Sequence, residues 1–127
     1  MISVNRLDHF VLTVKDIAKT VDFYTNVLGM RKEIFKGSRI ALKYANCKIN
    51  LHKLGEEFEP KAFNVKEGSA DLCFIINTPI VESKEYIESL GLKIEEGIIE
   101  RTGAKGTIQS IYLRDPDKNL IELSNYI

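Results

Sequence analysis

Apolar and polar residues follow a strand pattern and then a helix pattern in the first part of the chain. "LDHFVLTV" at 7–14 mixes branched and aromatic residues over strand length. The next stretch, "KDIAKTVDFYTNVLGM", repeats apolar residues at intervals of four, three and four, which predicts a helix that begins after Asp16 and stops at Gly29. The apolar stripe of this helix comprises Ile17, Val21, Tyr24 and Leu28. Turn residues then separate three expected strands, at 30–36, 39–45 and 47–54.

The same order begins again after a polar connector at 55–69. "ADLCFII" predicts a strand, and Thr78 followed by Pro79 predicts a helix with Thr78 as its N-cap and Gly91 as its stop. The stripe of the second helix comprises Ile80, Ser83, Ile87 and Leu90. Strands are expected at 93–100, 107–114 and 119–126, the last two joined by the turn "DPDKN".

Both halves therefore follow the order strand, helix, three strands, which predicts a duplication. The helix-ending glycines lie 62 positions apart, and this offset matches His9 with Asp71. In the last strands of the two halves "INLH" matches "IELS", which aligns Asn50 with Glu122 at an offset of 72. We predict one α+β domain of two tandem βαβββ modules, with module one at 6–54, a linker at 55–69 and module two at 70–127.

Polar residues at matched positions predict a shared site. If the modules pack around a pseudo-twofold axis, His9, Asn50, Asp71 and Glu122 converge on one cleft, joined by His52 on the face of Asn50. Imidazole and carboxylate groups on rigid strands suit a divalent cation, and His9, His52 and Glu122 together would resemble a two-His-one-carboxylate triad. Taken singly, the histidines are also typical of structural residues, Asp71 of a turn cap and Glu122 of a surface glutamate.

Composition removes several classes of function. Eighteen basic and eighteen acidic residues cancel, so the chain offers no large field of one sign for nucleic acid or anionic lipid. The longest apolar run, 72–76, is far too short to span a bilayer, and the first residues do not form a signal peptide, so we expect a cytoplasmic protein. Cys47 and Cys73 lie in apolar segments without CxxC spacing, which predicts two reduced core residues.

Two segments carry a family resemblance that covers nearly the whole chain. "LDHFVLTVKDIAKTVDFYTNVLGM" with "DPDKNLIEL" resembles the vicinal-oxygen-chelate superfamily, which holds glyoxalase I, bleomycin-resistance proteins, extradiol dioxygenases and fosfomycin-resistance enzymes. "NLHKLGEEFEPKA", "GSADLCFI" and "RTGAKG" are similar to the subgroup of glyoxalase-domain-containing protein five and its bacterial virulence-protein relatives. The motifs identify the superfamily but not one reaction, because one fold hosts several chemistries.

The resemblance implies an eight-stranded open cup, often completed across a homodimer, with a divalent ion such as Mn²⁺, Fe²⁺, Ni²⁺, Zn²⁺ or Mg²⁺. It implies metal ligands on the first and last strands of each module. His9 and Glu122 match the residue types of the family, whereas Asp71 and Asn50 depart from them. These departures argue against ordinary glyoxalase I activity, which is expected to use carboxylates on both sides of its substrate.

The same resemblance implies lyase or isomerase chemistry, similar to that of lactoylglutathione lyase, on a small oxygen-chelating substrate through an enediolate or oxyanion. A bound metal would act as a Lewis acid. Glu122 would be a ligand and, if it can swing off the ion, the general base, with Asp71 as the alternative base. Arg101 and Lys105 would add a charged, flexible lid over the substrate, or they would be solvated loop charges. An apolar wall of the substrate site would be lined by Tyr44, Phe74 and Tyr112, or these aromatic residues would belong to the core.

Rival functions follow from the same family. A metal-free module of the bleomycin-resistance type would sequester a ligand in the cleft of a dimer, and a ring-cleaving dioxygenase would use the metal differently. An interaction subunit without a ligand would need a filled, apolar cleft, in which a charged Glu122 lacks a partner.

Overall fold

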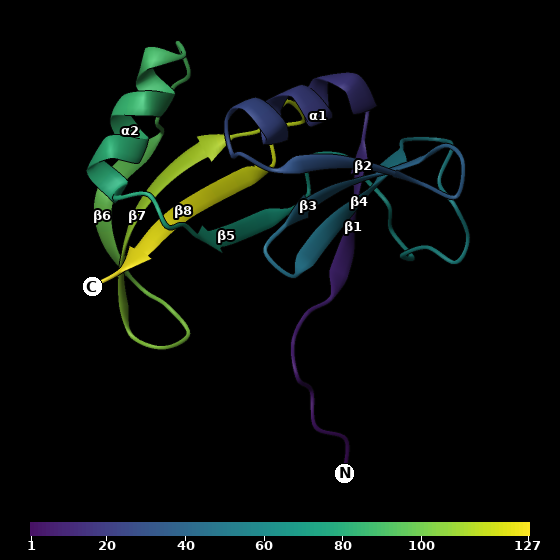
Figure 1. Cartoon of the computed structure of the whole chain (residues 1–127), viewed down its shortest axis with the longest axis horizontal. Coiled ribbons are helices and arrows are strands. Elements are labelled where there is room, and N and C mark those ends of the chain that lie inside the picture. The colour runs from purple at the N-terminus through teal and green to yellow at the C-terminus, as the bar shows by residue number, and fades with distance from the viewer. The chain divides into compact units, whose positions relative to one another are not determined.

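The computed structural model describes all 127 residues and has two compact units, Met1–Glu67 and Gly68–Ile127. Each unit holds one βαβββ module (Figure 1). The first contains β1 (His9–Val14), α1 (Ile17–Asn26), β2 (Arg31–Phe35), β3 (Arg39–Tyr44) and β4 (Cys47–Lys53). The second contains β5 (Asp71–Ile75), α2 (Ile80–Ser89), β6 (Glu96–Thr102), β7 (Thr107–Arg114) and β8 (Leu120–Tyr126). The predicted α+β class and the repeated order of elements are confirmed.

Each unit forms an open, mixed sheet of four strands. The first sheet has the order β1-β4-β3-β2 and the second the order β5-β8-β7-β6. In both, the first and last strands of the module run parallel and the remaining pairs antiparallel. A parallel pair needs a long crossover, which the helix and the two middle strands supply.

Each helix covers one face of the sheet in its own unit. α1 contacts β2, β3 and β4, and α2 contacts β7 and β8. Beneath α1 the sheet buries Leu12, Val14, Leu42, Ile49 and Leu51, and beneath α2 it buries Ile111, Leu113, Ile121 and Leu123. These residues alternate along their strands with polar ones, as expected for a sheet with a core on one face.

The register of the strands repeats between the units. Val11 pairs with Asn50 across β1 and β4, and Cys73 pairs with Glu122 across β5 and β8. These two pairs are related by the offsets of 62 and 72 that the sequence predicted. Asn50 and Glu122 therefore occupy equivalent positions in the two sheets.

The first helix begins as predicted, but it ends at Asn26, before the expected stop at Gly29, and it buries a different stripe. The Asp16 side chain accepts a hydrogen bond from the Lys19 backbone N–H at 3.0 Å, as an N-cap does. The buried residues are Thr20, Phe23 and Tyr24, so only Tyr24 of the expected stripe is buried. Thr20 tolerates burial because its hydroxyl donates to the Asp16 carbonyl oxygen at 3.0 Å.

The second helix starts one residue later than predicted. Pro79 occupies the N-cap position and makes no side-chain capping bond, so the assignment of Thr78 as N-cap is wrong. The Thr78 carbonyl oxygen instead accepts a hydrogen bond from Asn125 Nδ2 at 3.1 Å, which fastens the turn before α2 to the end of β8. Ile80, Ser83 and Ile87 are buried as expected, whereas Leu90 is exposed.

A buried polar turn joins β7 to β8, where the sequence predicted one. Asp115 Oδ1 accepts from the backbone N–H groups of Asp117 and Asn119, both at 2.9 Å. Asn119 Nδ2 donates to Asp115 Oδ2 at 2.8 Å, and Asn119 Oδ1 accepts from the Ala70 N–H at 2.8 Å. The turn thereby fixes the start of β5, where Asp71 lies.

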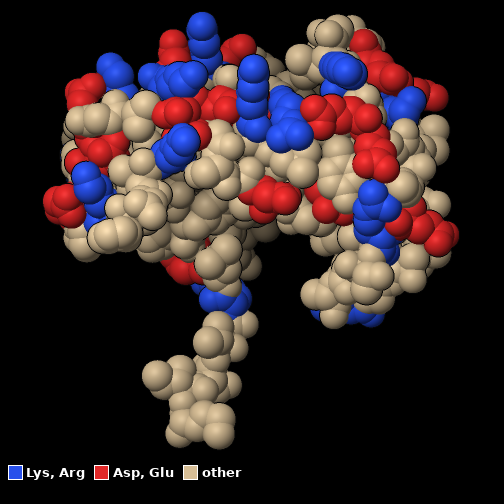
Figure 2. All heavy atoms as spheres, turned by 180° about the vertical axis from the view of Figure 1, so that it is seen from behind, with Lys and Arg blue, Asp and Glu red and all other residues tan.

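Charges of both signs are mixed over the surface. In Figure 2, Lys and Arg side chains lie beside Asp and Glu side chains over the visible face, in keeping with the zero net charge. Neither helix has the length and apolar character that a membrane span requires.

Both cysteines are free thiols. Cys47 is half-buried and Cys73 is exposed, so the prediction of a core position is wrong for Cys73. Cys73 shares a sheet face with its partner Glu122, away from the core beneath α2. An apolar segment of the sequence could not reveal which of its alternate residues face the helix.

Candidate functional site

The side of the first sheet away from α1 carries polar residues and is called here the first polar face. Paired residues point to the same face, so the pairs His9–Lys48, Val11–Asn50 and Thr13–His52 place all three polar candidates of this unit on it. His9 and Asn50 lie on neighbouring strands, offset by two residues along them. Their side chains therefore project from adjacent points on one surface.

A carboxylate orients the imidazole of His9. His9 Nδ1 lies 2.8 Å from Asp8 Oδ2. An ionised carboxylate only accepts hydrogen bonds, so Nδ1 is the donor, and in the neutral imidazole Nε2 keeps its lone pair. The bond to His9 is the main reason why the pKa of Asp8 is lowered. Histidines that bind metals are commonly oriented by a carboxylate in this way.

Two buried polar atoms on the first polar face have no hydrogen-bond partner. They are Asn50 Oδ1 and His52 Nδ1. Asn50 is 8% exposed and His52 2% exposed. Because buried polar atoms nearly always find a partner, these two mark a place where a polar ligand would be stabilised.

The structure does not bring His52 to His9. His52 pairs with Thr13, four residues along β1 from His9, a separation of about 13 Å at strand spacing. Two imidazoles that stand roughly perpendicular to a sheet do not span this separation to share an ion. The triad of His9, His52 and Glu122 is therefore not supported, because the strand register holds the two histidines apart.

His52 instead belongs to a cluster with Arg39 and Phe58. Its ring packs edge-on against Phe58 with the centroids 5.4 Å apart, and its Nε2 lies 3.5 Å from Arg39 Nη2. Burial lowers the pKa of His52, and the positive charge of Arg39 lowers it further. The imidazole is thus held in its neutral form.

The second sheet has an equivalent polar face, away from α2. It carries Asp71 and Cys73 from β5, Ser110 and Tyr112 from β7, and Glu122 and Ser124 from β8. Asp71 and Glu122 are offset by two residues on neighbouring strands, as His9 and Asn50 are in the first unit. Each polar face therefore presents two candidate donors in the same register.

Hydroxyl groups hold the Glu122 carboxylate. Ser110 Oγ donates to Glu122 Oε2 at 2.6 Å, and Ser124 Oγ lies 2.7 Å from Ser110 Oγ. Cys73 Sγ extends this chain, 3.4 Å from Ser124 Oγ. Ser110 and Ser124 are fully buried, so the chain orients one carboxylate oxygen from within the sheet.

Arg101 and Tyr112 lie on the same polar face as Glu122. Arg101 Nε donates to the Tyr112 hydroxyl at 3.1 Å, and Arg101 Nη2 pairs with Glu96 at 3.3 Å. Burial raises the pKa of Tyr112, the bond from Arg101 opposes this rise, and Glu122 adds to it. Tyr112 therefore stays protonated and is positioned to donate toward Glu122. Arg101 lies within β6, a paired strand, rather than in a flexible loop.

The other predicted substrate residues lie elsewhere. Lys105 occupies the turn between β6 and β7, which the Gly103 N–H closes by donating to the Gly106 carbonyl oxygen at 2.7 Å. Tyr44 and Phe74 alternate along their strands with residues of the polar faces, so they point to the helix-covered sides. Of the expected aromatic wall, only Tyr112 lies on a polar face.

Each polar face carries nitrogen or oxygen donors that suit a divalent cation. On the first, His9 has an oriented imidazole and Asn50 an unpartnered oxygen, and on the second, Glu122 has an oriented carboxylate. Such a mixed set suits Mn²⁺, Fe²⁺, Ni²⁺ or Zn²⁺. Neither unit by itself gathers three His, Cys, Asp or Glu side chains in a metal-binding group.

Sequence reasoning missed the residues that support the candidates. Asp8 precedes His9 directly, so their adjacency was a visible signal for an oriented imidazole. Ser110, Arg39 and Phe58 gave no such signal. Strand pairing brings Ser110 to Glu122 and Arg39 to His52. The path of the connector brings Phe58 to His52.

Comparison with known proteins places the chain in a family. The model of the Glyoxalase/Bleomycin resistance protein/Dioxygenase superfamily matches residues 6–123. Virulence protein STM3117 of Salmonella typhimurium is 54% identical over 124 residues, which cover 98% of this chain and 86% of that protein. Its crystal structure matches with a TM-score of 0.98 over 99% of this chain and 100% of that chain.

Two further relatives extend the comparison. Glyoxalase domain-containing protein RDO1 of Mycosarcoma maydis is 51% identical over 125 residues, which cover 98% of this chain and 70% of that protein. A mutant of the fosfomycin resistance protein FosX of Listeria monocytogenes, solved with Mn(II) and 1S,2S-dihydroxypropylphosphonic acid, matches with a TM-score of 0.68 and 26% identity. That match covers 98% of this chain and 93% of the other. The chain belongs to the glyoxalase/bleomycin resistance/dioxygenase superfamily.

Proposed function

We propose that this chain is a metal-dependent enzyme that carries out lyase or isomerase chemistry on a small substrate with neighbouring oxygens. The observation that carries the proposal is the repeated register, which gives each polar face two donors at matched positions, His9 with Asn50 and Asp71 with Glu122. The Mn(II) held by the FosX relative supports a divalent ion in this family.

In this proposal His9 and Glu122 are the principal ligands, with Asn50 and Asp71 completing the set. The donors come from both modules, within one chain or across a cytoplasmic homodimer. The ion would act as a Lewis acid that polarises the substrate oxygens as an enediolate or oxyanion develops. Asp8 keeps Nε2 of His9 available, because it holds the proton on Nδ1.

Glu122 is the proposed general base when its carboxylate swings off the ion, and Asp71 is the alternative. Ser110 fixes one oxygen of the Glu122 carboxylate and leaves the other outside the hydroxyl chain. Tyr112 stays protonated beside Glu122 and is the candidate donor toward a substrate oxygen, positioned by Arg101. Lys105, on the turn after β6, would contact only a substrate that extends to that turn.

A metal-free binding module is the second candidate. The observation in its favour is that neither unit alone gathers three strong metal ligands. A protein of this kind would bind its ligand through the polar faces and the aromatic residues near them, without turnover.

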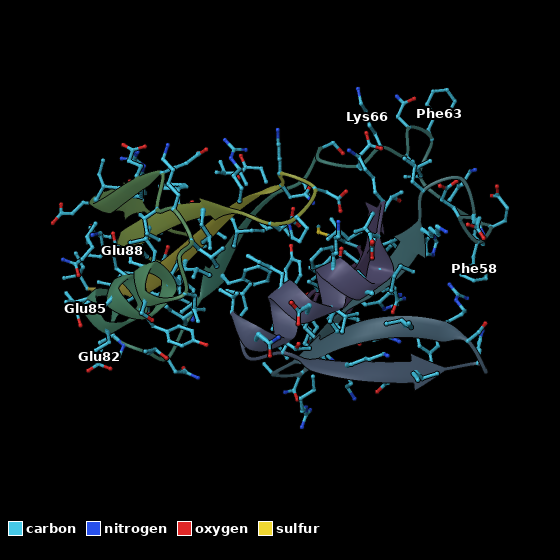
Figure 3. The ribbon with its side chains drawn as sticks, turned by 90° about the horizontal axis from the view of Figure 1, so that it is seen from above. Phe58, Phe63, Lys66, Glu82, Glu85 and Glu88 are labelled. Atoms are coloured by element: carbon cyan, nitrogen blue, oxygen red, sulfur yellow. The ribbon has the colours of Figure 1, made fainter.

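Metal content separates the two candidates. Protein purified without chelator should hold nearly one divalent ion per chain, measured by elemental analysis, and His9→Ala and Glu122→Gln should each lose it. Glu88→Gln is the matched control, because Glu88 lies exposed on α2, paired with Lys84 (Figure 3). Retention of metal by both site variants, or absence of metal from the unaltered protein after incubation with Mn²⁺, Ni²⁺ and Zn²⁺, would reject the metal-dependent enzyme.

A further inference from the structure

Arg39 lies over two aromatic rings at the first polar face. Its guanidinium carbon lies 4.2 Å from the centroid of the Phe58 ring and 5.3 Å from that of Phe35. Phe58 comes from the connector after β4, where Figure 3 labels it together with Phe63. Phe63 is fully exposed, whereas Phe58 is engaged with Arg39 and His52. A guanidinium that stacks on aromatic rings keeps the N–H donors at its edges available to a ligand.

No acidic side chain pairs with Arg39. Its one hydrogen-bond contact is the long one of 3.5 Å to the His52 imidazole, although a guanidinium offers five N–H donors. Glu57, the acidic group that acts on His52, is bound by the Gly55 backbone N–H and by Lys61 at 3.4 Å. The positive charge of Arg39 is thus fixed in direction and is not neutralised.

A second cation lies next to the same ring. Lys48 Nζ is 4.0 Å from the centroid of Phe35 and also forms no salt bridge. By contrast, Lys43 on the same polar face pairs with Glu33 at 3.3 Å. Two cations without a salt bridge therefore lie next to Phe35, on the face that holds the unpartnered buried atoms of Asn50 and His52.

We propose that Arg39 binds an anionic group of the substrate, a carboxylate or a phosphoryl or phosphonyl group, with Phe58 and Phe35 fixing the plane of the guanidinium and Lys48 adding charge. Bidentate binding of two oxygens by the open guanidinium edge suits planar and tetrahedral oxyanions alike. The inference rests on the proposed function, since it names the class of substrate as an anion. Its subsite lies wholly within the first unit and can be tested without metal or turnover.

The test is a titration of metal-free protein with inorganic phosphate, and separately with acetate, at constant ionic strength. NMR follows the Nε–H resonance of Arg39 and the backbone amides of β3 and β4. We expect saturable shifts with at least one anion, and Arg39→Gln should weaken this binding by about tenfold or more. Lys43→Gln removes the same charge from the same strand and face, so it is the matched control and should change the affinity by less than about twofold.

Phe58→Leu keeps the charge of Arg39 and removes the nearer of its two aromatic rings. It should weaken binding by about threefold, and it keeps the proposal testable if Arg39→Gln does not fold. Shifts that do not saturate with either anion, equal losses in Arg39→Gln and Lys43→Gln, or full affinity in Phe58→Leu would overturn the proposal.

The metal variants separate this inference from the proposed function. His9→Ala and Glu122→Gln should lose metal but keep anion binding. If anion binding is absent while metal binding holds, the anion subsite alone is rejected. If the reverse is found, the subsite stands and the metal-dependent mechanism is rejected.

Discussion

Asp8 Oδ2 accepts a hydrogen bond from His9 Nδ1 at 2.8 Å. This contact fixes the tautomer of the imidazole and points the lone pair of Nε2 outward from the bond. It is the one feature of the first polar face that prepares His9 to bind a cation, although the pair is exposed to solvent.

We predict that Asp8→Asn weakens binding of the divalent ion by about 10-fold to 100-fold, because the imidazole loses the carboxylate that orients it. The measurement is a competitive metal titration with a chromophoric chelator. Asp22→Asn is the control, since Asp22 bonds only within α1, to Asn26 at 2.6 Å, on the exposed surface. Equal metal affinity in the Asp8 variant and the control would show that His9 needs no orienting partner.

The hydroxyl of Ser110 should matter for metal binding through Glu122. Ser110→Ala removes the donor 2.6 Å from Glu122 Oε2, so the carboxylate loses its fixed orientation. We expect about tenfold weaker metal binding, a smaller loss than in Glu122→Gln. The same titration measures it, with Ser89→Ala as control, because Ser89 bonds to its own helix at Tyr86. A loss as large as that in Glu122→Gln would point to a collapse of the face instead.

His52 should make stability depend on pH. Its pKa is lowered from the ordinary 6.5 by burial and by Arg39, so the unfolded chain binds the proton more readily than the folded chain. The stabilisation is therefore complete above about pH 6.5 and is lost as the pH falls through the lowered pKa of the folded state.

Urea unfolding at about pH 7.5 and about pH 5.5 measures this effect, in a range above the carboxylate titrations. The free energy of unfolding should fall between the two values, and His52→Asn should reduce the fall. Arg39→Gln should reduce it in part, because it removes the second cause of the lowered pKa. An unchanged fall in His52→Asn would assign the pH dependence to other groups.

The buried turn before β8 should contribute strongly to stability. Asn119→Ala removes the bonds to Asp115 Oδ2 and to the Ala70 N–H, both 2.8 Å, and leaves these buried groups unpaired. We expect a loss of about 2–4 kcal/mol in the free energy of unfolding, measured with urea. Asn26→Ala, which removes an exposed bond to Asp22, should cost about 0.5 kcal/mol or less. A similar cost for both variants would contradict a special role for the turn.

The fold followed from local patterns in the sequence. Apolar residues that recur every second residue predict strands, and those that recur about every 3.6 residues predict helices, which end before a glycine. These patterns belong to short segments, and their repetition along the chain predicted the two modules. Gly91 directly follows the C-cap Leu90 of α2 and adopts a positive φ of 77°, which explains why this helix stops there. Gly29, with a φ of 67°, lies two residues beyond the C-cap Val27 of α1, in the turn that follows that helix. The matched positions of Asn50 and Glu122 followed from the same offsets.

The surroundings of the candidate residues came only from the tertiary structure. Strand register decided that His52 lies beside Thr13, four residues along β1 from His9, and the connector brought Phe58 onto Arg39, nineteen positions earlier in the chain. Pairing of β7 with β8 set Ser110 against Glu122. The sequence by itself determined the elements and the types of donor, because these depend on neighbours along the chain. Which donors meet, which are buried and which lack a partner depends on contacts between distant segments, and only the folded chain decides them.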